Sequence, residues 1–357
     1  MECYKILAIN PGSTSTKIAV FANDENIFLK NIKHSADELK PFATIADQFS
    51  FRKEVILKEL GIAGIDLKSI TAIVGRGGLL KPIESGVYEV NEAMKADLRN
   101  GLMGEHASNL GGLIADDIAK ELGAKAYIAD PVVVDELQPV ARFAGHPLFS
   151  RISIFHALNQ KAIARTYAKS VGKNYEDLNL IIAHLGGGVS VGAHEKGRVI
   201  DVNNALDGEG PFSPERSGTL PAGQLAKLCF SGKYTYEEVR KIINGKGGLV
   251  GFTGSNDAYE LEMKAVNGDA EAKLLQDAMS YNIGKWIGTM ISVLKGKVDG
   301  IILTGGMAHN PFIVDYVKDM VSFAAPIVVY PGEDEMAALA MNGLFVLKNE
   351  ITPKEYK

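Results

Sequence analysis

The chain has few cysteines. Cys3 and Cys229 are the only two in 357 residues. With only two cysteines, we expect neither a disulfide framework nor a thiolate metal site. We therefore expect a protein of a reducing compartment, the cytoplasm.

Long apolar runs and concentrated positive charge are missing too. No apolar run approaches the ~20 residues that span a bilayer, and the start, Met1-Glu2-Cys3-Tyr4-Lys5, lacks the basic region of a signal peptide. The 38 basic and 43 acidic residues give a net charge of −5, without a basic stripe interleaved with aromatics. We expect neither a membrane nor a nucleic acid as partner.

Glycine, by contrast, is abundant. The chain has 38 glycines, and no low-complexity segment contains them. Glycines dispersed through a folded chain indicate turns at which the backbone closely approaches a ligand. A length of 357 residues also exceeds that of most single-core proteins, so we expect two domains.

Short apolar runs alternate with segments of helical period, which predicts an α/β fold. Asn10 and Gly12 follow an apolar strand, and His184 and Gly186 do the same 174 residues further on. Hairpins resemble one another, so one match is indecisive. Two such hairpins, each near the head of a half-chain, favour an internal duplication, with a ligand cleft between the copies. We also expect a helix over Ile152–Ser170 that carries His156.

The first candidate site is the turn between two strands, Asn10-Pro11-Gly12-Ser13-Thr14-Ser15-Thr16-Lys17. A glycine turn lets backbone N–H groups converge on an anion, and the hydroxyls add further donors. The segment is not a Walker A loop, because Gly-Lys-Ser/Thr is missing and a strand follows. A plain polar hairpin turn is the alternative, but it seldom needs three successive hydroxyls.

Two more glycine clusters follow apolar strands. His184-Leu185-Gly186-Gly187-Gly188 allows close approach of a polyphosphate, although a tight turn alone could also use these glycines. Thr304-Gly305-Gly306 could let a nucleoside lie against the backbone, which is a weaker signal.

Three charged residues complete the candidates from the residues alone. Arg76 and Arg216 lie in glycine-rich loops, and their planar guanidinium groups suit carboxylate or phosphate. Lone arginines are usually solvated surface residues, so we leave both readings open. Asp130 lies between two apolar runs and could be catalytic, a cap or a turn residue.

Longer stretches resemble the acetate/butyrate kinase family, which belongs to the superfamily of sugar kinases, heat-shock ATPases and actin. The stretches are ILAINPGSTSTKIAVF from Ile6, RISIFHALNQKA from Arg151, HLGGGVSVGAH from His184 and DVNNALDGEGPFSPERSGTLP from Asp201. With the GRGG and LTGGMAHNP segments, the resemblance extends over nearly the whole chain.

The resemblance implies a role for each matching residue. Asn10, Ser13, Thr14, Ser15 and Lys17 would form the first phosphate loop, and His184 with Gly186, Gly187 and Gly188 the second. Gly305, Gly306 and Asp257 would lie near adenosine. The implied catalytic residues are Arg76, Asp130, His156 and Arg216, with Arg76 and His106 near the substrate. Magnesium would involve Asn10 with Glu335 and Asp334, although Glu333-Asp334-Glu335 leaves the carboxylate register open.

The resemblance also implies two duplicated actin-like (ribonuclease H-like) domains with a central cleft. We expect them at residues 1–149 with about 332–357, and at 150–331. The implied reaction is butyrate + ATP = butanoyl phosphate + ADP with Mg²⁺, in a homo-oligomer of two or more copies. The alternatives are a kinase for acetate, propionate, isobutyrate or isovalerate, a non-catalytic nucleotide-switch ATPase, and a sugar kinase.

Overall fold

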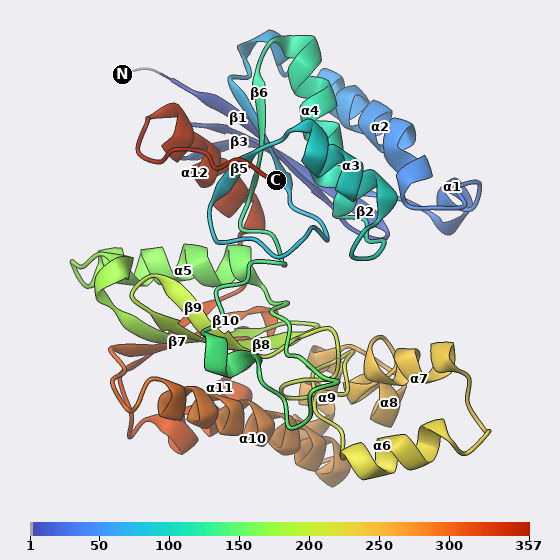
Figure 1. The fold of residues 1–357 in the computed structure, drawn as a ribbon, viewed down its shortest axis with the longest axis vertical. Coiled ribbons are helices and arrows are strands. Elements are labelled where there is room, and N and C mark those ends of the chain that lie inside the picture. The colour runs from blue at the N-terminus through green and yellow to red at the C-terminus, as the bar shows by residue number, and fades with distance from the viewer. Residues whose placement is uncertain (1–2) are drawn as a thin grey trace. The chain divides into compact units, whose positions relative to one another are not determined.

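The computed structural model describes residues 3–357 and divides into two compact units (Figure 1). Unit 1 contains residues 3–134 together with Ala157–Asn159 and Asp334–Lys357. Unit 2 contains Asp135–His156 and Gln160–Glu333. The C-terminal segment therefore belongs to the same unit as the N-terminal strands.

Unit 1 is built on a six-stranded sheet with the order β3-β2-β1-β4-β6-β5. The strands β1, β2 and β3 form an antiparallel meander, whereas β4 and β6 continue the sheet parallel to β1. The strand bounds are β1 (Lys5–Pro11), β2 (Ser15–Ala22), β3 (Glu25–Lys33), β4 (Ala72–Arg76), β5 (Val87–Glu89) and β6 (Lys125–Ala129).

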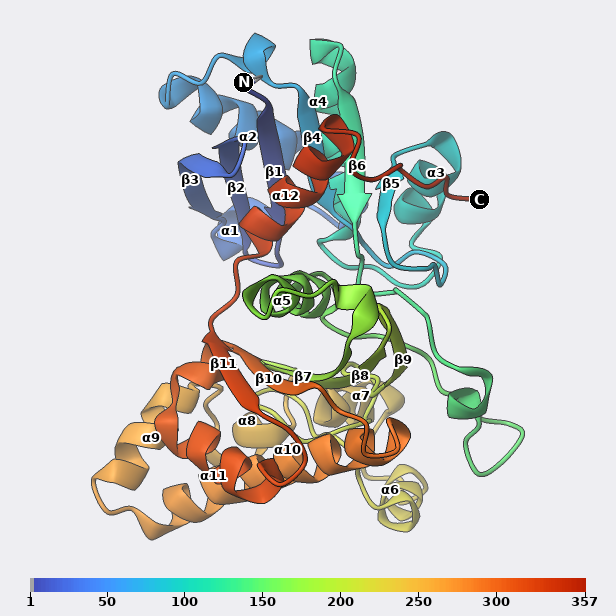
Figure 2. The ribbon, with the colours of Figure 1, turned by 90° about the vertical axis from the view of Figure 1, so that its left-hand side faces the viewer.

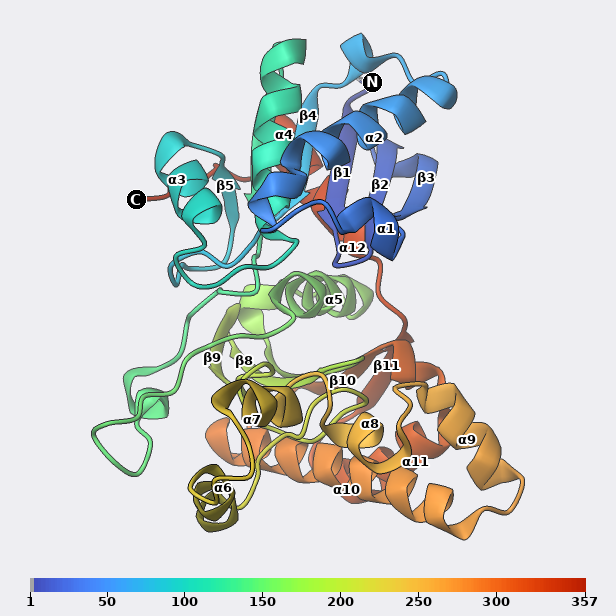
Figure 3. The same ribbon diagram turned by 90° about the vertical axis from the view of Figure 1, so that its right-hand side faces the viewer.

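Helices cover both faces of the unit 1 sheet. Figures 2 and 3 show α12 (Glu335–Leu347) on one face, and α2 (Phe49–Ile62) and α4 (Asn109–Leu122) on the other. The central strands are buried on both sides, so β1 and β4 are apolar runs without alternation. The smaller helices are α1 (Ala36–Leu39), α3 (Glu92–Asn100), η1 (Ala46–Gln48) and η2 (Leu67–Ser69).

Unit 2 repeats the arrangement with five strands in the order β11-β10-β7-β8-β9. Here β7, β8 and β9 form the antiparallel meander, and β10 and β11 are the parallel strands. Their bounds are β7 (Asn179–Leu185), β8 (Val189–Glu195), β9 (Arg198–Val202), β10 (Gly300–Gly305) and β11 (Ile327–Pro331). Read from the other end, β9-β8-β7-β10-β11, this order matches β3-β2-β1-β4-β6 of unit 1 strand for strand, which confirms the predicted duplication.

The two faces of β7 belong to different cores of unit 2. Ile181 and Ala183 pack with α10 (Ala270–Val293) and α11 (Pro311–Val321), whereas Leu180 and Ile182 pack with α5 (Ala157–Ser170). Figure 2 shows α5 on one side of this sheet and α10 on the other. The other helices are α6 (Ala222–Cys229), α7 (Tyr236–Ile243), α8 (Gly248–Thr253), α9 (Ala258–Val266), η3 (Pro139–Arg142), η4 (Tyr175–Asp177) and η5 (Gly306–His309).

One sequence expectation about a helix is wrong in a way that matters for the site. The helix predicted over Ile152–Ser170 begins at Ala157, and His156 precedes it as the N-cap residue with φ −79° and ψ 62°. The segment before it is extended and irregular, which apolar spacing alone could not reveal. Within residues 3–357, no helix combines the length and apolar character needed to cross a membrane.

Two mid-helix glycines should respond to alanine with opposite signs. A Cβ at Gly343 in α12 would lie 2.7 Å from Cγ2 of Val74 on β4, whereas nothing lies within 4 Å of a Cβ at Gly288 in α10. We expect Gly343→Ala to lower the free energy of unfolding by about 1–3 kcal/mol. Gly288→Ala should raise it by about 0.5–1 kcal/mol. Urea unfolding of both variants is the measurement; a stabilised Gly343→Ala protein would contradict the close packing.

Candidate active site

The first predicted phosphate loop is the turn between β1 and β2. Asn10 is buried at the end of β1, Ser13 and Thr14 are exposed in the turn, and Ser15 begins β2. The turn closes through the Gly12 N–H, which donates to the Ser15 carbonyl at 2.7 Å. Lys17 is exposed on β2, opposite Asn10 in the strand register.

A fully buried arginine holds this turn from behind. Arg52 of α2 is 0% exposed. Its Nη1 donates to the carbonyls of Gly12 at 2.8 Å and Ser15 at 3.0 Å, and its Nη2 to the carbonyl of Ser13 at 3.2 Å. Gln48 accepts from Nε at 3.0 Å and from Nη2 at 2.8 Å.

The hydrogen-bond partners of Arg52 are carbonyls, the Gln48 amide and the hydroxyl of Thr16, and none of them is a carboxylate. Burial accordingly lowers the pKa of its guanidinium. Because the carbonyls of the turn are bound by Arg52, their orientation is fixed. A buried positive charge thus lies on one side of the loop, which favours an anion on the other side. Sequence reasoning missed Arg52, whose helical context resembles a solvated helix face.

Three predicted residues of unit 1 form one polar cluster. Arg76, at the end of β4, makes a two-pronged pair with Glu335, with Nη2–Oε1 at 3.1 Å and Nη1–Oε2 at 3.2 Å. Asn10 donates to Glu335 Oε2 at 2.5 Å and accepts from Arg76 Nη1 at 3.3 Å. An arginine carries five N–H donors, so these contacts leave Arg76 further donors for a second anion.

The other two acidic candidates near the start of α12 have different contacts. Asp334 is the N-cap residue of α12 and accepts from the Ala337 N–H at 2.8 Å. Glu333 lies 3.5 Å from Nε2 of His184. No group of three or more His, Cys, Asp or Glu side chains within residues 3–357 could hold a metal ion by itself. Glu335 is therefore the carboxylate of the three that lies beside Asn10.

Asp130 has a strained backbone at the end of β6. Its φ is +37°, which is uncommon for a residue other than glycine. The side chain is 1% exposed, and its Oδ1 accepts from Ser85 Oγ at 2.6 Å and from the Gly86 N–H at 2.8 Å. A buried carboxylate in a strained conformation is typical of a functional site.

His106 is exposed in the segment before α4. Its Nδ1 accepts from the Ser108 N–H at 3.2 Å and lies 2.7 Å from Ser108 Oγ. These contacts make Nε2 the protonated nitrogen in the neutral ring.

The second predicted phosphate loop is the turn between β7 and β8, which corresponds to the β1–β2 turn. Gly186 donates to the Gly188 carbonyl at 3.1 Å and closes it. Gly188 is required by packing, since a Cβ there would lie 1.7 Å from Nη1 of Arg216. Ser213 Oγ donates to the Gly187 carbonyl at 2.7 Å and ties the loop to the segment that carries Arg216.

Arg216 is largely buried beside this loop. Its Nη1 donates to the Ala205 carbonyl at 2.9 Å, and its buried Nε has no hydrogen-bond partner in the part of the chain that is described. Burial lowers the pKa of the guanidinium, and Glu215 partly opposes that effect. A buried cation with an unused donor is poised to bind an anion.

Two predicted histidines lie face to face in unit 2. The rings of His156 and His184 stack with centroids 3.8 Å apart and an interplanar angle of 12°. Two positive imidazolium rings at that separation would repel by about 4 kcal/mol at an effective dielectric constant of 20. The stack therefore favours at most one charged ring.

The predicted adenosine residues come from two places in unit 2, the end of β10 and the start of α9. Gly305 ends β10 with φ +90°, and a Cβ there would lie 2.4 Å from the Leu185 carbonyl, so glycine is required. Gly306 is open, with nothing within 4 Å of a Cβ. Asp257 is the N-cap residue of α9 and accepts from the N–H groups of Tyr259 and Glu260 at 2.9 and 3.1 Å.

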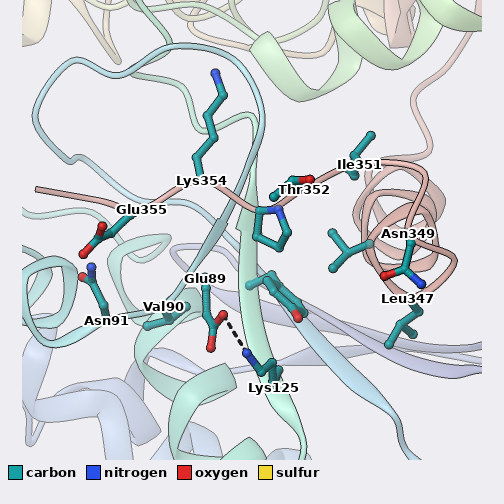
Figure 4. Close-up of a pocket in the computed structure, with 13 residues that line it drawn as sticks. Glu89, Val90, Asn91, Lys125, Leu347, Asn349, Ile351, Thr352, Lys354 and Glu355 are labelled. Atoms are coloured by element: carbon teal, nitrogen blue, oxygen red, sulfur yellow. Dashed lines mark hydrogen bonds and ion pairs between the residues drawn. The ribbon is translucent and has the colours of Figure 1, made fainter.

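Each unit thus collects its own set of predicted residues. Unit 1 brings Asn10, Arg76 and Glu335 into contact, and unit 2 brings together His156 with His184, and Gly188 with Arg216. A hollow of about 620 Å³ near the C-terminus of unit 1 contains none of them. It is lined by surface residues such as Lys125 and Glu89, which form an ion pair at 2.9 Å (Figure 4).

Solved structures with the same fold are small-acid kinases. An acetate kinase from Porphyromonas gingivalis superimposes with a TM-score of 0.79 at 21% identity, covering 96% of this chain and 100% of that one. A propionate kinase from Francisella tularensis gives 0.74 at 19% identity, with coverage of 95% and 98%. The fold is therefore that of the acetate and propionate kinases.

Sequence relatives define the family. Residues 148–323 match the model of the acetokinase family. "Butyrate kinase 2" of Clostridium acetobutylicum is 57% identical over 354 residues, 99% of both chains. "Probable butyrate kinase" of Phocaeicola vulgatus is 56% identical over 353 residues, again 99% of both. The chain belongs to the acetokinase family.

Removing Arg52 should loosen the β1–β2 turn. Arg52→Met leaves the carbonyls of the turn without their donors, so we expect the free energy of unfolding to fall by about 2–4 kcal/mol. Amide hydrogen exchange in residues 10–18 should accelerate at least about tenfold, as 1.4 kcal/mol of local stability is lost. Exchange mass spectrometry measures this directly.

The matched control is the next residue on the same helix. Lys53 pairs with Asp117 and Glu121, both at 2.6 Å, and these contacts are away from the turn. Lys53→Met should leave exchange of the turn unchanged. Equal exchange in Arg52→Met and the parent protein would refute the role of Arg52.

Proposed function

We propose that this chain is a carboxylate kinase that transfers the γ-phosphoryl group of ATP to butyrate, reversibly forming butanoyl phosphate and ADP. The observation that carries the proposal is the 56–58% identity, over 99% of the chain, to proteins named as butyrate kinases. Family membership implies the use of ATP and ADP, and the two glycine turns are compatible with a polyphosphate.

Charge repulsion is the obstacle that the reaction must overcome. A fatty-acid carboxylate has a pKa near that of Glu, about 4.3, so it is ionised at pH 7 and requires no general base. It must, however, approach an anionic γ-phosphoryl group, and at 4 Å each pair of like unit charges costs about 4 kcal/mol at an effective dielectric constant of 20. Catalysis should rest on cations, N–H donors and in-line alignment.

The residues of unit 1 would serve the carboxylate and the first phosphate loop. Arg76 would bind the substrate carboxylate through donors that its contacts with Glu335 and Asn10 leave available. Ser13, Thr14 and Ser15, together with Lys17, would donate to phosphate oxygens. His106 would lie near the substrate. Asp130 would be a catalytic residue whose carboxyl group orients hydrogen-bond donors.

The residues of unit 2 would stabilise the transferring group and the nucleotide. Arg216 would neutralise phosphoryl oxygens, and His156 and His184 would donate to them. The Gly186–Gly188 turn would hold the phosphates. Gly305, Gly306 and Asp257 would lie near the nucleoside, where the open backbone at Gly306 would admit a flat group. The proposed reaction requires both sets of residues to act on one pair of substrates.

Magnesium fits the residues beside β1. Magnesium usually takes one or two protein carboxylates, with phosphate oxygens and waters as its other ligands. Glu335 and the amide oxygen of Asn10 lie in one cluster and match that demand, and Asp334 is the next carboxylate along the chain. When bound, the ion would shield the charge of the ATP phosphates.

Self-association is a further part of the proposal. Phe143, Leu148 and Phe149 are 81%, 82% and 67% exposed within one loop of unit 2. Exposed apolar clusters of this kind are typical of protein interfaces. We propose a homo-oligomer of two or more copies, and light scattering will give the number.

The reaction can be tested by trapping its product. Purified protein with ATP, Mg²⁺, hydroxylamine and each of the C2 to C5 acids should give the most hydroxamate with butyrate. One methylene changes the selectivity by only about 1–3 kcal/mol. Acids one carbon shorter or longer should therefore still react, but more slowly than butyrate. ATP hydrolysis without hydroxamate would instead favour a nucleotide switch.

Arg76→Ala and Arg216→Ala test the proposed charge compensation. Each should lower kcat for hydroxamate formation about 10²–10³-fold, as observed when a donor to a developing charge is removed. Arg99→Ala is the control, because Arg99 is an exposed arginine of α3. Turnover near that of the control in both variants would remove these arginines from the mechanism.

A further inference from the structure

A buried chain of polar side chains in unit 2 ends at His156. It begins at Tyr175, whose hydroxyl lies 2.6 Å from Nδ1 of the fully buried His194. His194 Nε2 lies 2.9 Å from Gln160 Oε1, and Gln160 Nε2 lies 2.9 Å from Ser190 Oγ. Ser190 Oγ in turn lies 2.8 Å from His156 Nδ1.

The direction of each hydrogen bond follows from one fixed acceptor. The Ser190 carbonyl can only accept, and the Gln160 side chain lies 3.0 Å from it, so the group there is the NH₂ and Oε1 faces His194. His194 therefore donates from Nε2 and accepts from the Tyr175 hydroxyl. Burial lowers the pKa of His194 far below its usual value, and the charge of Lys161 adds to this, so the ring is neutral.

The Ser190 hydroxyl accepts hydrogen bonds from Gln160 and from the His156 backbone, and it has one proton of its own to donate. Its Oγ accepts from Gln160 Nε2, and the backbone N–H of His156 points to the same atom at 3.4 Å. The single hydroxyl proton is then left for His156 Nδ1, which must accept it. A neutral imidazole that accepts at Nδ1 carries its proton on Nε2.

We infer that Gln160 and Ser190 are positioning residues that fix His156 as the neutral Nε2–H tautomer. In this state His156 presents a hydrogen-bond donor from Nε2, which is what a phosphoryl oxygen requires. The opposite tautomer would present a lone pair to the same oxygen and repel it. The catalytic benefit rests on the proposed kinase reaction, but the tautomer itself does not.

Stacking and capping hold the ring in place for this purpose. His156 is the N-cap residue of α5, and Gln160 lies one turn along the same helix. The ring lies against His184 at 3.8 Å. The stack thus fixes the plane of the His156 ring, and Ser190 determines which of its nitrogens carries the proton. Ser190 and Gln160, which set the proton, are not among the residues proposed to touch the substrate.

The tautomer can be measured without any assay of activity. In protein with ¹⁵N-labelled histidine, long-range ¹H–¹⁵N spectra distinguish protonated from unprotonated ring nitrogens, and loss of one ring system in His156→Gln assigns the signal. We expect His156 to be protonated on Nε2 only at pH 7. An Nδ1–H ring or an imidazolium there would overturn the inference, even if Ser190 variants fail to fold.

Ser190→Ala tests whether the chain sets the tautomer. The variant should show a mixture of Nδ1–H and Nε2–H at His156, and kcat should fall about 10–100-fold, as for other residues that orient a functional histidine. KM for both substrates should change less than threefold. Ser190→Thr keeps the hydroxyl and should restore the single tautomer.

Ser280→Ala is the matched control. Ser280 is a serine 1% exposed in the same unit, and its hydroxyl donates to the Gln276 carbonyl within α10. This variant should keep both the tautomer and kcat. An unchanged His156 spectrum in folded Ser190→Ala would overturn the inference. A correct tautomer in a protein that makes no hydroxamate would leave the inference standing and reject the proposed reaction.

Discussion

A buried arginine lies against the glycine turn of the first hairpin in each unit. Arg52 binds three carbonyls of the β1–β2 turn. Arg216 occupies the space that a side chain at position 188 would fill beside the β7–β8 turn. Both guanidinium groups have pKa values lowered by burial. In each unit, a positive charge is buried beside a turn whose backbone is held in place. Burying this charge costs free energy, and an anion bound at the turn would offset that cost.

The duplication explains why the halves share this plan and differ in detail. The strand order is the same in both units, so each places a hairpin turn at the same position relative to its parallel strands. The turn of unit 1 carries hydroxyls, and its arginine comes from a helix behind it. The turn of unit 2 carries three glycines, and its arginine comes from a loop packed directly on Gly188. One topology has thus supplied two forms of anion-compatible turn.

Local patterns predicted the α/β class, the hairpins and the duplication, because apolar period and glycine placement are short-range signals. The residue roles and the domain boundaries remain predictions. Contacts between residues far apart in the chain could not be predicted from these local patterns. Arg52 is separated from Gly12 by 40 positions, and its helix shows little amphipathic pattern. His156 was expected inside a helix because its neighbours are apolar, whereas the structure makes it the cap, where Ser190 of β8 reaches its ring.

The cluster of Asn10, Arg76 and Glu335 forms only when segments that are far apart in the chain have packed together. Asn10 and Glu335 are 325 positions apart, and they meet because α12 returns to pack on β1 and β4. Without Glu335, Arg76 would lose the carboxylate that it pairs with, and Asn10 would lose the acceptor that orients its amide. Strand β1 and helix α12 must therefore both be in place before the cluster of Asn10, Arg76 and Glu335 has its geometry. A Cβ at Gly343 would lie 2.7 Å from Cγ2 of Val74, so glycine at this position lets α12, the helix that begins with Glu335, pack closely on β4.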